Sequence, residues 1–243
     1  MNVSVPLLIL PGHLCNRRLF THQTNHLSDV ADIAVADLYG ADSVRRLAAI
    51  AIAPMPREFV VLANSMGGAV AFEVMRQVPE RVAGLALVGT TARPEWPSQN
   101  ARRRPAAELA ARGDFKSIAE MYGPVFFHPE RTQGGAHIRT LELMIEEAGY
   151  AGLRNQQKAF TDRPDSRPTL PDISCPTFVL CGRDDVVTPL YMSEEIADGI
   201  PNAQLTVLDT CGHIPMLEWP EETTGLIRRW LSSLRDQGGS SWA

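Results

Sequence analysis

No stretch of the 243-residue chain approaches the roughly 20 apolar residues that a membrane-spanning helix needs. The first ten residues, "MNVSVPLLIL", lack a basic segment and a small-residue cleavage site, and their short apolar run passes directly into "PGH". These absences argue against a membrane protein and against a secretory leader.

The chain also lacks a long basic run, and its net charge is −5, so we expect no nucleic-acid partner. Its densest basic cluster is the triplet Arg102, Arg103 and Arg104. The simplest interpretation of this triplet is a solvated helix face. The alternative is that one of these arginines reaches an anionic substrate.

Cysteine is scarce, and the four cysteines have unlike spacings: Cys15, Cys175, Cys181 and Cys211. They suggest neither metal-ligand pairs nor a disulfide framework, and we expect a reduced, cytoplasmic protein. A metal site could be imagined from His13, Cys15, His22 and His26, but this set has no carboxylate and no matching second cluster. We therefore predict neither a metal nor a cofactor, and a packing role for Cys15 rather than a reactive thiol.

Apolar runs alternate with helical segments through most of the chain. Six runs are typical of strands: residues 5–10, 32–38, 59–63, 85–89, 177–182 and 204–209. Helices are expected over residues 42–52, 67–78, 189–200 and 222–236. Most strand candidates are continuously apolar, as in parallel strands that are covered on both faces. The pattern predicts an α/β fold with a doubly wound, mostly parallel sheet.

Residues 93–165 break this alternation. They offer no convincing strand but several amphipathic helical pieces, at 98–113, 114–123, 135–149 and 150–160. We predict that they form a helical cap over the carboxyl ends of the strands, where open α/β sheets bind ligands. The core would then comprise residues 1–92 and 166–243. Some aromatic residues of the cap are candidates for lining a pocket, although packing is the default for each: Trp96, Tyr122, Phe126, Phe127, Tyr150 and Phe160.

The sequence "LANSMGGAV" places Ser65 where a strand candidate becomes a helix. A serine at this position is either a helix cap or a nucleophile held on a tight turn. A hydroxyl is a poor nucleophile at neutral pH, so a reactive serine needs an adjacent base, and that base needs an acid to orient it.

Candidates for both groups follow later strands. Asp185 lies in "LCGRDDVVTP", three residues beyond the strand that ends at Gly182, and the adjacent Asp184 fits this spacing as well. His213 lies in "LDTCGHIPMLEWPEE", on the loop after the last strand. We predict that His213 takes the proton of Ser65 and that Asp185 orients and stabilises the imidazole.

The order Ser65, Asp185, His213 resembles that of the α/β-hydrolase superfamily. Here "ANSMGG" resembles its nucleophile elbow, with Ala63 in place of the usual glycine, "GRDDVVTP" its acid loop and "CGHIPMLEWPE" its histidine loop. The resemblance covers essentially the whole chain and implies Asp185, rather than Asp184, as the acid.

A tetrahedral intermediate requires hydrogen-bond donors for its oxyanion. One is expected to be the backbone N–H of Met66, at the start of the helix that follows Ser65. The resemblance implies a second donor in the loop after the first strand. By position this is the backbone N–H of His13, with Leu14 as the alternative.

We therefore expect a cofactor-free serine esterase that cleaves a small or medium carboxylic ester through an acyl-enzyme. The chain resembles bacterial carboxylesterases, pimeloyl-carrier-protein methyl esterases and enol-lactonases. Three alternatives remain on the same three residues: carbon–carbon bond hydrolysis of a dienoate, suggested by Asn64 and "GRDD", enol-lactone hydrolysis, and cofactor-free perhydrolysis. A small-ligand receptor or sensor of this fold is an alternative of another class. The sequence leaves the oligomeric state open.

Overall fold

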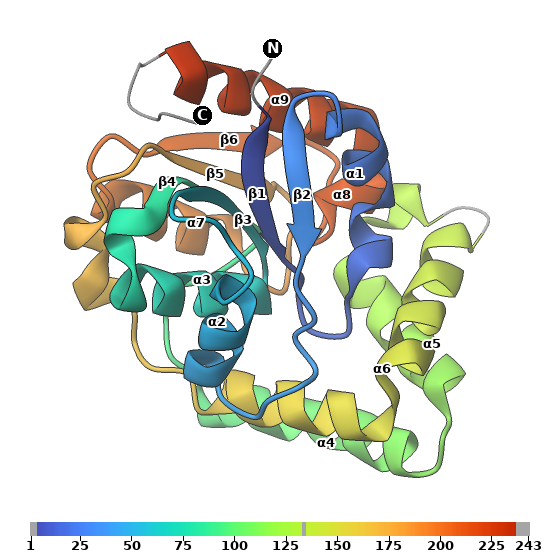
Figure 1. The fold of residues 1–243 in the computed structure, drawn as a ribbon. Helices are drawn as coiled ribbons and strands as arrows, with labels where there is room; N and C mark the ends of the chain where they lie inside the picture. The colour runs from blue at the N-terminus through green and yellow to red at the C-terminus, as the bar shows by residue number, and fades with distance from the viewer. Residues whose placement is uncertain (1–3, 133–134, 237–243) are drawn as a thin grey trace.

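A computed structural model of the protein describes residues 4–132 and 135–236 (Figure 1). Six strands form one sheet in the order β2-β1-β3-β4-β5-β6, and every pairing is parallel. The strands are β1 Val5–Leu10, β2 Ala31–Val35, β3 Phe59–Asn64, β4 Val82–Val88, β5 Thr177–Gly182 and β6 Gln204–Leu208. The predicted α/β fold with a mostly parallel sheet is confirmed.

Helices cover both faces of this sheet (Figure 1). The α-helices of the described residues are α1 Thr21–Leu27, α2 Val44–Ile52, α3 Met66–Gln77, α4 Pro97–Ala111, α5 Phe115–Phe126, α6 Ala136–Thr161, α7 Leu190–Gly199, α8 Pro215–Glu218 and α9 Pro220–Asp236. Short 3-10 turns lie at η1 Arg17–Phe20, η2 Pro79–Arg81, η3 Pro129–Arg131 and η4 Arg167–Asp172. Helices α2, α3 and α7 pack on one face, and α1 and α9 pack on the other.

Successive side chains of each strand enter two separate hydrophobic cores. In β1, Leu7 and Ile9 join the core under α1 and α9, whereas Leu8 and Leu10 join the core under α2 and α3. Every residue of β3 and of β5 is buried. Burying one such aliphatic side chain contributes about 1.5–3 kcal/mol. Because both faces are covered, these strands are apolar throughout rather than at alternate positions.

Some element boundaries differ from the prediction. Strand β2 ends at Val35 rather than at residue 38, because the Asp37 carboxylate accepts the N–H of Tyr39 at 2.8 Å and turns the chain. Helix α1 was not predicted, since it is short and buries only Gln23 and Leu27. The pieces expected at 135–149 and 150–160 form α6, which is interrupted at Gly149, where φ is 59° and ψ is −179°.

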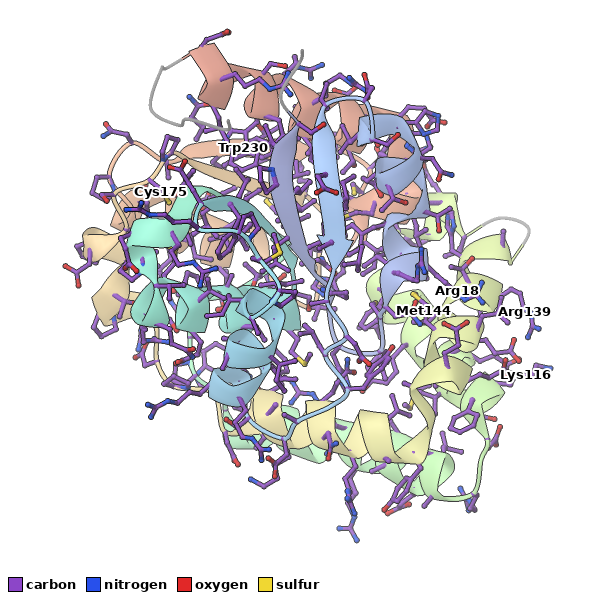
Figure 2. All side chains as sticks on the ribbon, viewed as in Figure 1. Arg18, Lys116, Arg139, Met144, Cys175 and Trp230 are labelled. Atoms are coloured by element: carbon purple, nitrogen blue, oxygen red, sulfur yellow. The ribbon has the colours of Figure 1, made fainter. Side chains whose placement is uncertain are left out.

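Between β4 and η4 the described residues contain helices α4, α5 and α6 and no strand. These three helices pack on one another and lie at the end of the sheet toward which the β2 arrow points (Figure 1). Arg18 of η1, labelled in Figure 2, attaches this layer to the N-terminal part of the chain. Its Nε donates to Glu147 of α6 at 2.6 Å.

Candidate active site

Ser65 occupies a tight turn between β3 and α3. Its backbone has φ of 52° and ψ of −118°, which residues other than glycine seldom adopt. The turn brings Gly67 so close to β1 that a Cβ atom there would lie 2.0 Å from the carbonyl oxygen of Leu10. Ser65 makes no side-chain capping hydrogen bond to α3. The helix-cap interpretation therefore does not describe this serine.

The Ser65 hydroxyl instead meets His213, which is 148 positions away in the sequence. Nε2 of His213 lies 2.9 Å from Oγ of Ser65, and Nδ1 lies 2.8 Å from Oδ2 of Asp185. Asp185 and His213 are only 3% and 1% exposed. The three side chains that the sequence singled out thus form one continuous hydrogen-bonded chain of buried groups.

The Asp185 carboxylate is held as an anion. Burial alone would raise its pKa, but the charge of His213 and hydrogen bonds from His213 and Thr188 outweigh that effect and lower it. Oδ1 accepts the backbone N–H groups of Val187 and Thr188 at 2.8 and 2.9 Å. The hydroxyl of Thr188 donates to Oδ2 at 2.7 Å. Asp184 points elsewhere: it is half exposed and lies 3.8 Å from Nε2 of His128.

Two of the three amides considered for an oxyanion site are free of protein acceptors within the described residues: those of Met66 and His13. The amide of Leu14, by contrast, donates to Oε1 of Gln156 at 3.0 Å. An incoming oxyanion would have to displace that bond at Leu14, but it would displace no bond at His13. The hydrogen bonds thus favour the amide of His13 over that of Leu14 as the second donor to an oxyanion.

Sequence reasoning missed two polar residues that hold these groups. Thr188 binds Asp185, as described above. Glu218, which is 5% exposed, accepts the amide of Gly212 at 2.9 Å and that of His128 at 2.7 Å. The sequence did contain a sign that could have pointed to Glu218. It is an acidic residue within the largely apolar run "HIPMLEW", five positions after His213.

A cavity of about 220 Å³ adjoins the histidine loop. It is lined by Arg103, Met121, Tyr122, Val125, Phe126, Val186 and Val187. Phe126 packs on the ring of His213, with 5.3 Å between ring centroids, and its carbonyl accepts the His213 amide at 2.8 Å. Of the aromatic residues considered for a pocket, Tyr122 and Phe126 line this cavity. Tyr150 lines a neighbouring one of about 50 Å³.

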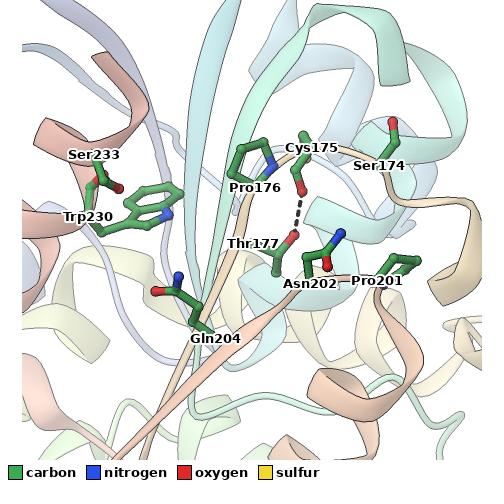
Figure 3. Close-up of a pocket in the computed structure, with 9 residues that line it drawn as sticks. All are labelled: Ser174, Cys175, Pro176, Thr177, Pro201, Asn202, Gln204, Trp230 and Ser233. Carbon is green, nitrogen blue, oxygen red and sulfur yellow. Dashed lines mark hydrogen bonds between the residues drawn. The ribbon is translucent and has the colours of Figure 1, made fainter. Parts of the chain in front are cut away.

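A cavity of about 400 Å³ lies at the other end of the sheet (Figure 3). It is bordered by residues that precede or begin β5 and β6, among them Cys175, Thr177 and Gln204, and by Trp230 of α9. Asp185 and His213 follow the carboxyl ends of the same two strands. This cavity therefore has no part in the arrangement around Ser65.

The remaining candidates are placed as follows. Cys15 is buried, and burial raises the pKa of its thiol to about 12, as expected for a packing residue. Within residues 4–132 and 135–236, no three His, Cys, Asp or Glu side chains are grouped as a metal site would require. None of the helices in these ranges is long and apolar enough to cross a membrane. The side chain of Arg102 lies outside what the structure describes.

A parallel sheet, a serine on a strained strand-to-helix turn, and an acid and a histidine that follow later strands define the α/β-hydrolase class. Residues 7–225 match the alpha/beta hydrolase family. The chain belongs to this family, and the prediction of an esterase-like hydrolase is confirmed.

Individual relatives agree with this assignment. The chain is 30% identical over 191 residues to a pimeloyl-[acyl-carrier protein] methyl ester esterase of Aromatoleum aromaticum, covering 71% of this chain and 74% of that one. It is 30% identical to an esterase from Thermogutta terrifontis solved with malate bound, with a TM-score of 0.86 and 96% and 92% of the two chains covered. An enol-lactonase from Burkholderia xenovorans, 18% identical, shares the fold with a TM-score of 0.84 over 94% and 92% of the chains.

Proposed function

We propose that the protein is a serine hydrolase that cleaves a carboxylic ester through an acyl-enzyme, with Ser65, His213 and Asp185 as its catalytic triad. The observation that carries this proposal is the pair of contacts at His213, 2.9 Å to the Ser65 hydroxyl and 2.8 Å to the Asp185 carboxylate. The first distance lies within reach for proton transfer from Ser65 to His213, and the second lets Asp185 orient and stabilise the imidazole.

In the first half-reaction, Oγ of Ser65 attacks the ester carbonyl carbon while its proton passes to Nε2 of His213. Asp185 stabilises the imidazolium through Nδ1. The amides of Met66 and His13 donate to the carbonyl oxygen as it becomes negative, and the start of α3 adds its dipole. The carbon–oxygen bond to the alcohol then breaks, and His213 returns the proton to the departing alkoxide. In the second half-reaction, water attacks the acyl-enzyme by the same route in reverse.

The helical residues 93–165 act in this proposal as a cap on the core of residues 1–92 and 166–243. The cavity of about 220 Å³ that α5 forms with Val186 and Val187 has the size and the apolar lining for a small or medium acyl group. The ester class is supported by the esterases among the relatives of at least 30% identity.

Labelling with a fluorophosphonate, followed by mass spectrometric mapping, tests the nucleophile. We expect one modified peptide, containing Ser65, and none in Ser65→Ala. Ser193→Ala, which removes another buried hydroxyl, is the matched control and should label normally. Label on another residue, or undiminished label in Ser65→Ala, would contradict the proposal. A panel of p-nitrophenyl esters of increasing acyl length then separates an enzyme from a receptor, which would turn over every ester only sluggishly.

A further inference from the structure

Arg103 of α4 forms a shared wall between two cavities of the helical layer. It lines the cavity of about 220 Å³ beside Phe126 and also the cavity of about 50 Å³ beside His13 and Leu14. The first cavity adjoins the His213 ring, and the second adjoins the loop that carries the amide of His13. Arg103 therefore lines both the cavity beside Phe126, which packs on the His213 ring, and the cavity beside the His13 loop.

The surroundings of Arg103 carry an uncompensated positive charge. Glu95, Arg103 and Arg163 form a cluster in which one carboxylate faces two guanidinium groups. Arg103 lies 2.7 Å from Glu95, and its side chain is 13% exposed. Arg163 is the more deeply buried partner, and it also donates to the carbonyl groups of Arg93 and Phe160. With two guanidinium groups and one carboxylate, the cluster carries a net charge of +1.

This charge acts on both cavities. Burial, together with the positive charge of Arg103, lowers the pKa of His13 to about 3. Burial raises the pKa of Tyr122, and the charge of Arg103 opposes that rise. Among the described residues that line the two cavities are Arg103 and Arg154 but no carboxylate. A guanidinium has five N–H donors, more than a single carboxylate can accept.

Tyr122 adds a second polar group to the same wall. It lines the larger cavity with Arg103, and its hydroxyl has no hydrogen-bond partner among the described residues. The other described residues that line this cavity are apolar. The described lining of this cavity is thus apolar except for one cation, Arg103, and one free hydroxyl, that of Tyr122.

We propose that Arg103 and Tyr122 form a carboxylate-binding subsite, so that the enzyme prefers esters whose acyl chain ends in a second, free carboxylate, that is, half-esters of short dicarboxylic acids. This inference rests on the proposed ester hydrolysis at Ser65. The apolar walls hold the methylene groups of the chain, and the guanidinium and the phenol bind the terminal carboxylate.

The test compares two substrate series in which only the terminal group differs. Monomethyl esters of succinate, glutarate, adipate and pimelate are paired with methyl esters of the corresponding monocarboxylic acids. Wild-type enzyme should favour the half-esters in kcat/KM, most strongly at one chain length. In Arg103→Gln the ratio of anionic to neutral kcat/KM should fall about 10- to 100-fold, and in Tyr122→Phe by a smaller factor. Arg103→Lys should recover part of the preference.

Arg104→Gln is the matched control, because Arg104 lies next to Arg103 on the same helix but is 82% exposed and pairs with Glu108. It should leave the ratio unchanged. A second measurement needs no variant: free carboxylates are tested for their ability to protect the wild-type enzyme from fluorophosphonate labelling. Free adipate should protect at much lower concentration than hexanoate.

The outcomes separate this inference from the function on which it rests. If wild-type enzyme turns over neither series, ester hydrolysis itself is wrong, and the subsite falls with it. If it hydrolyses the neutral esters but shows no preference for half-esters, or keeps that preference in Arg103→Gln, the esterase stands and the subsite is wrong. Equal protection by adipate and hexanoate also overturns the subsite, even should Arg103→Gln fail to fold.

Discussion

The carboxylate of Glu218 binds the backbone on both sides of His213: Oε2 lies 2.9 Å from the amide nitrogen of Gly212, and Oε1 lies 3.1 Å from that of Ile214. The same carboxylate accepts the amide of His128, just beyond α5. A single buried side chain thus fixes the position of the histidine and joins it to the helical layer that forms the cavity.

Replacing Glu218 by Gln should lower kcat while changing KM much less. A glutamine oxygen cannot accept all three amides, and its NH₂ group would face a backbone donor, so the histidine loop shifts relative to Ser65. We expect kcat to fall about 10- to 100-fold and the free energy of unfolding to drop by about 1–3 kcal/mol. Glu221→Gln, with its side chain 83% exposed, is the control. A rise in KM at constant kcat would show that Glu218 does not position His213.

Removing either end of the Ser65–His213 contact should abolish turnover without unfolding the protein. Ser65→Ala and His213→Ala should each lower kcat on an activated ester by roughly 10⁴-fold or more, because the nucleophile and its base act as one unit. The double variant should be hardly worse than either single one. Circular dichroism and thermal melts verify the fold. Near-normal turnover in purified Ser65→Ala would refute the assignment.

Two adjacent aspartates should respond differently to the same change. Asp185→Asn removes the anion that faces Nδ1 of His213 at 2.8 Å and should lower kcat by about 10²- to 10⁴-fold. Asp184→Asn alters a half-exposed group near His128 and should leave kcat within about threefold of wild type. The reverse pattern in steady-state kinetics would move the acid by one residue.

Much of the fold could be predicted because sequence pattern and tertiary environment agree. Strands such as β3 and β5 are buried on both faces, so their apolar runs are long enough to recognise. Ser65, Asp185 and His213 could be brought into one hypothesis because each follows a strand, and parallel strands end at one edge of a sheet. Helix α1 was missed because it is short and buries only two side chains.

The contacts around these groups could not be predicted in the same way. The environment of Glu218 depends on the direction of backbone amides in Gly212, Ile214 and His128, and residue types do not encode that direction. For Arg103 the sequence left a solvated face and a substrate contact open. Only the fold brings it to Glu95 and to the two cavities.

The partly buried His13, whose Nδ1 is shielded from solvent, should make the protein less stable in acid. Its pKa in the folded state is lowered to about 3, whereas a histidine in an unfolded chain has a pKa of about 6.5. Between these pH values the unfolded state binds a proton that the folded state does not, so the free energy of unfolding falls as the pH drops from about 6.5 toward 3. His13→Asn, measured by urea unfolding across this range, should show a shallower decline. His26→Asn, at an exposed ring, controls for the loss of an imidazole as such. Parallel declines in wild type and His13→Asn, or an NMR titration of the His13 ring near pH 6.5, would contradict this.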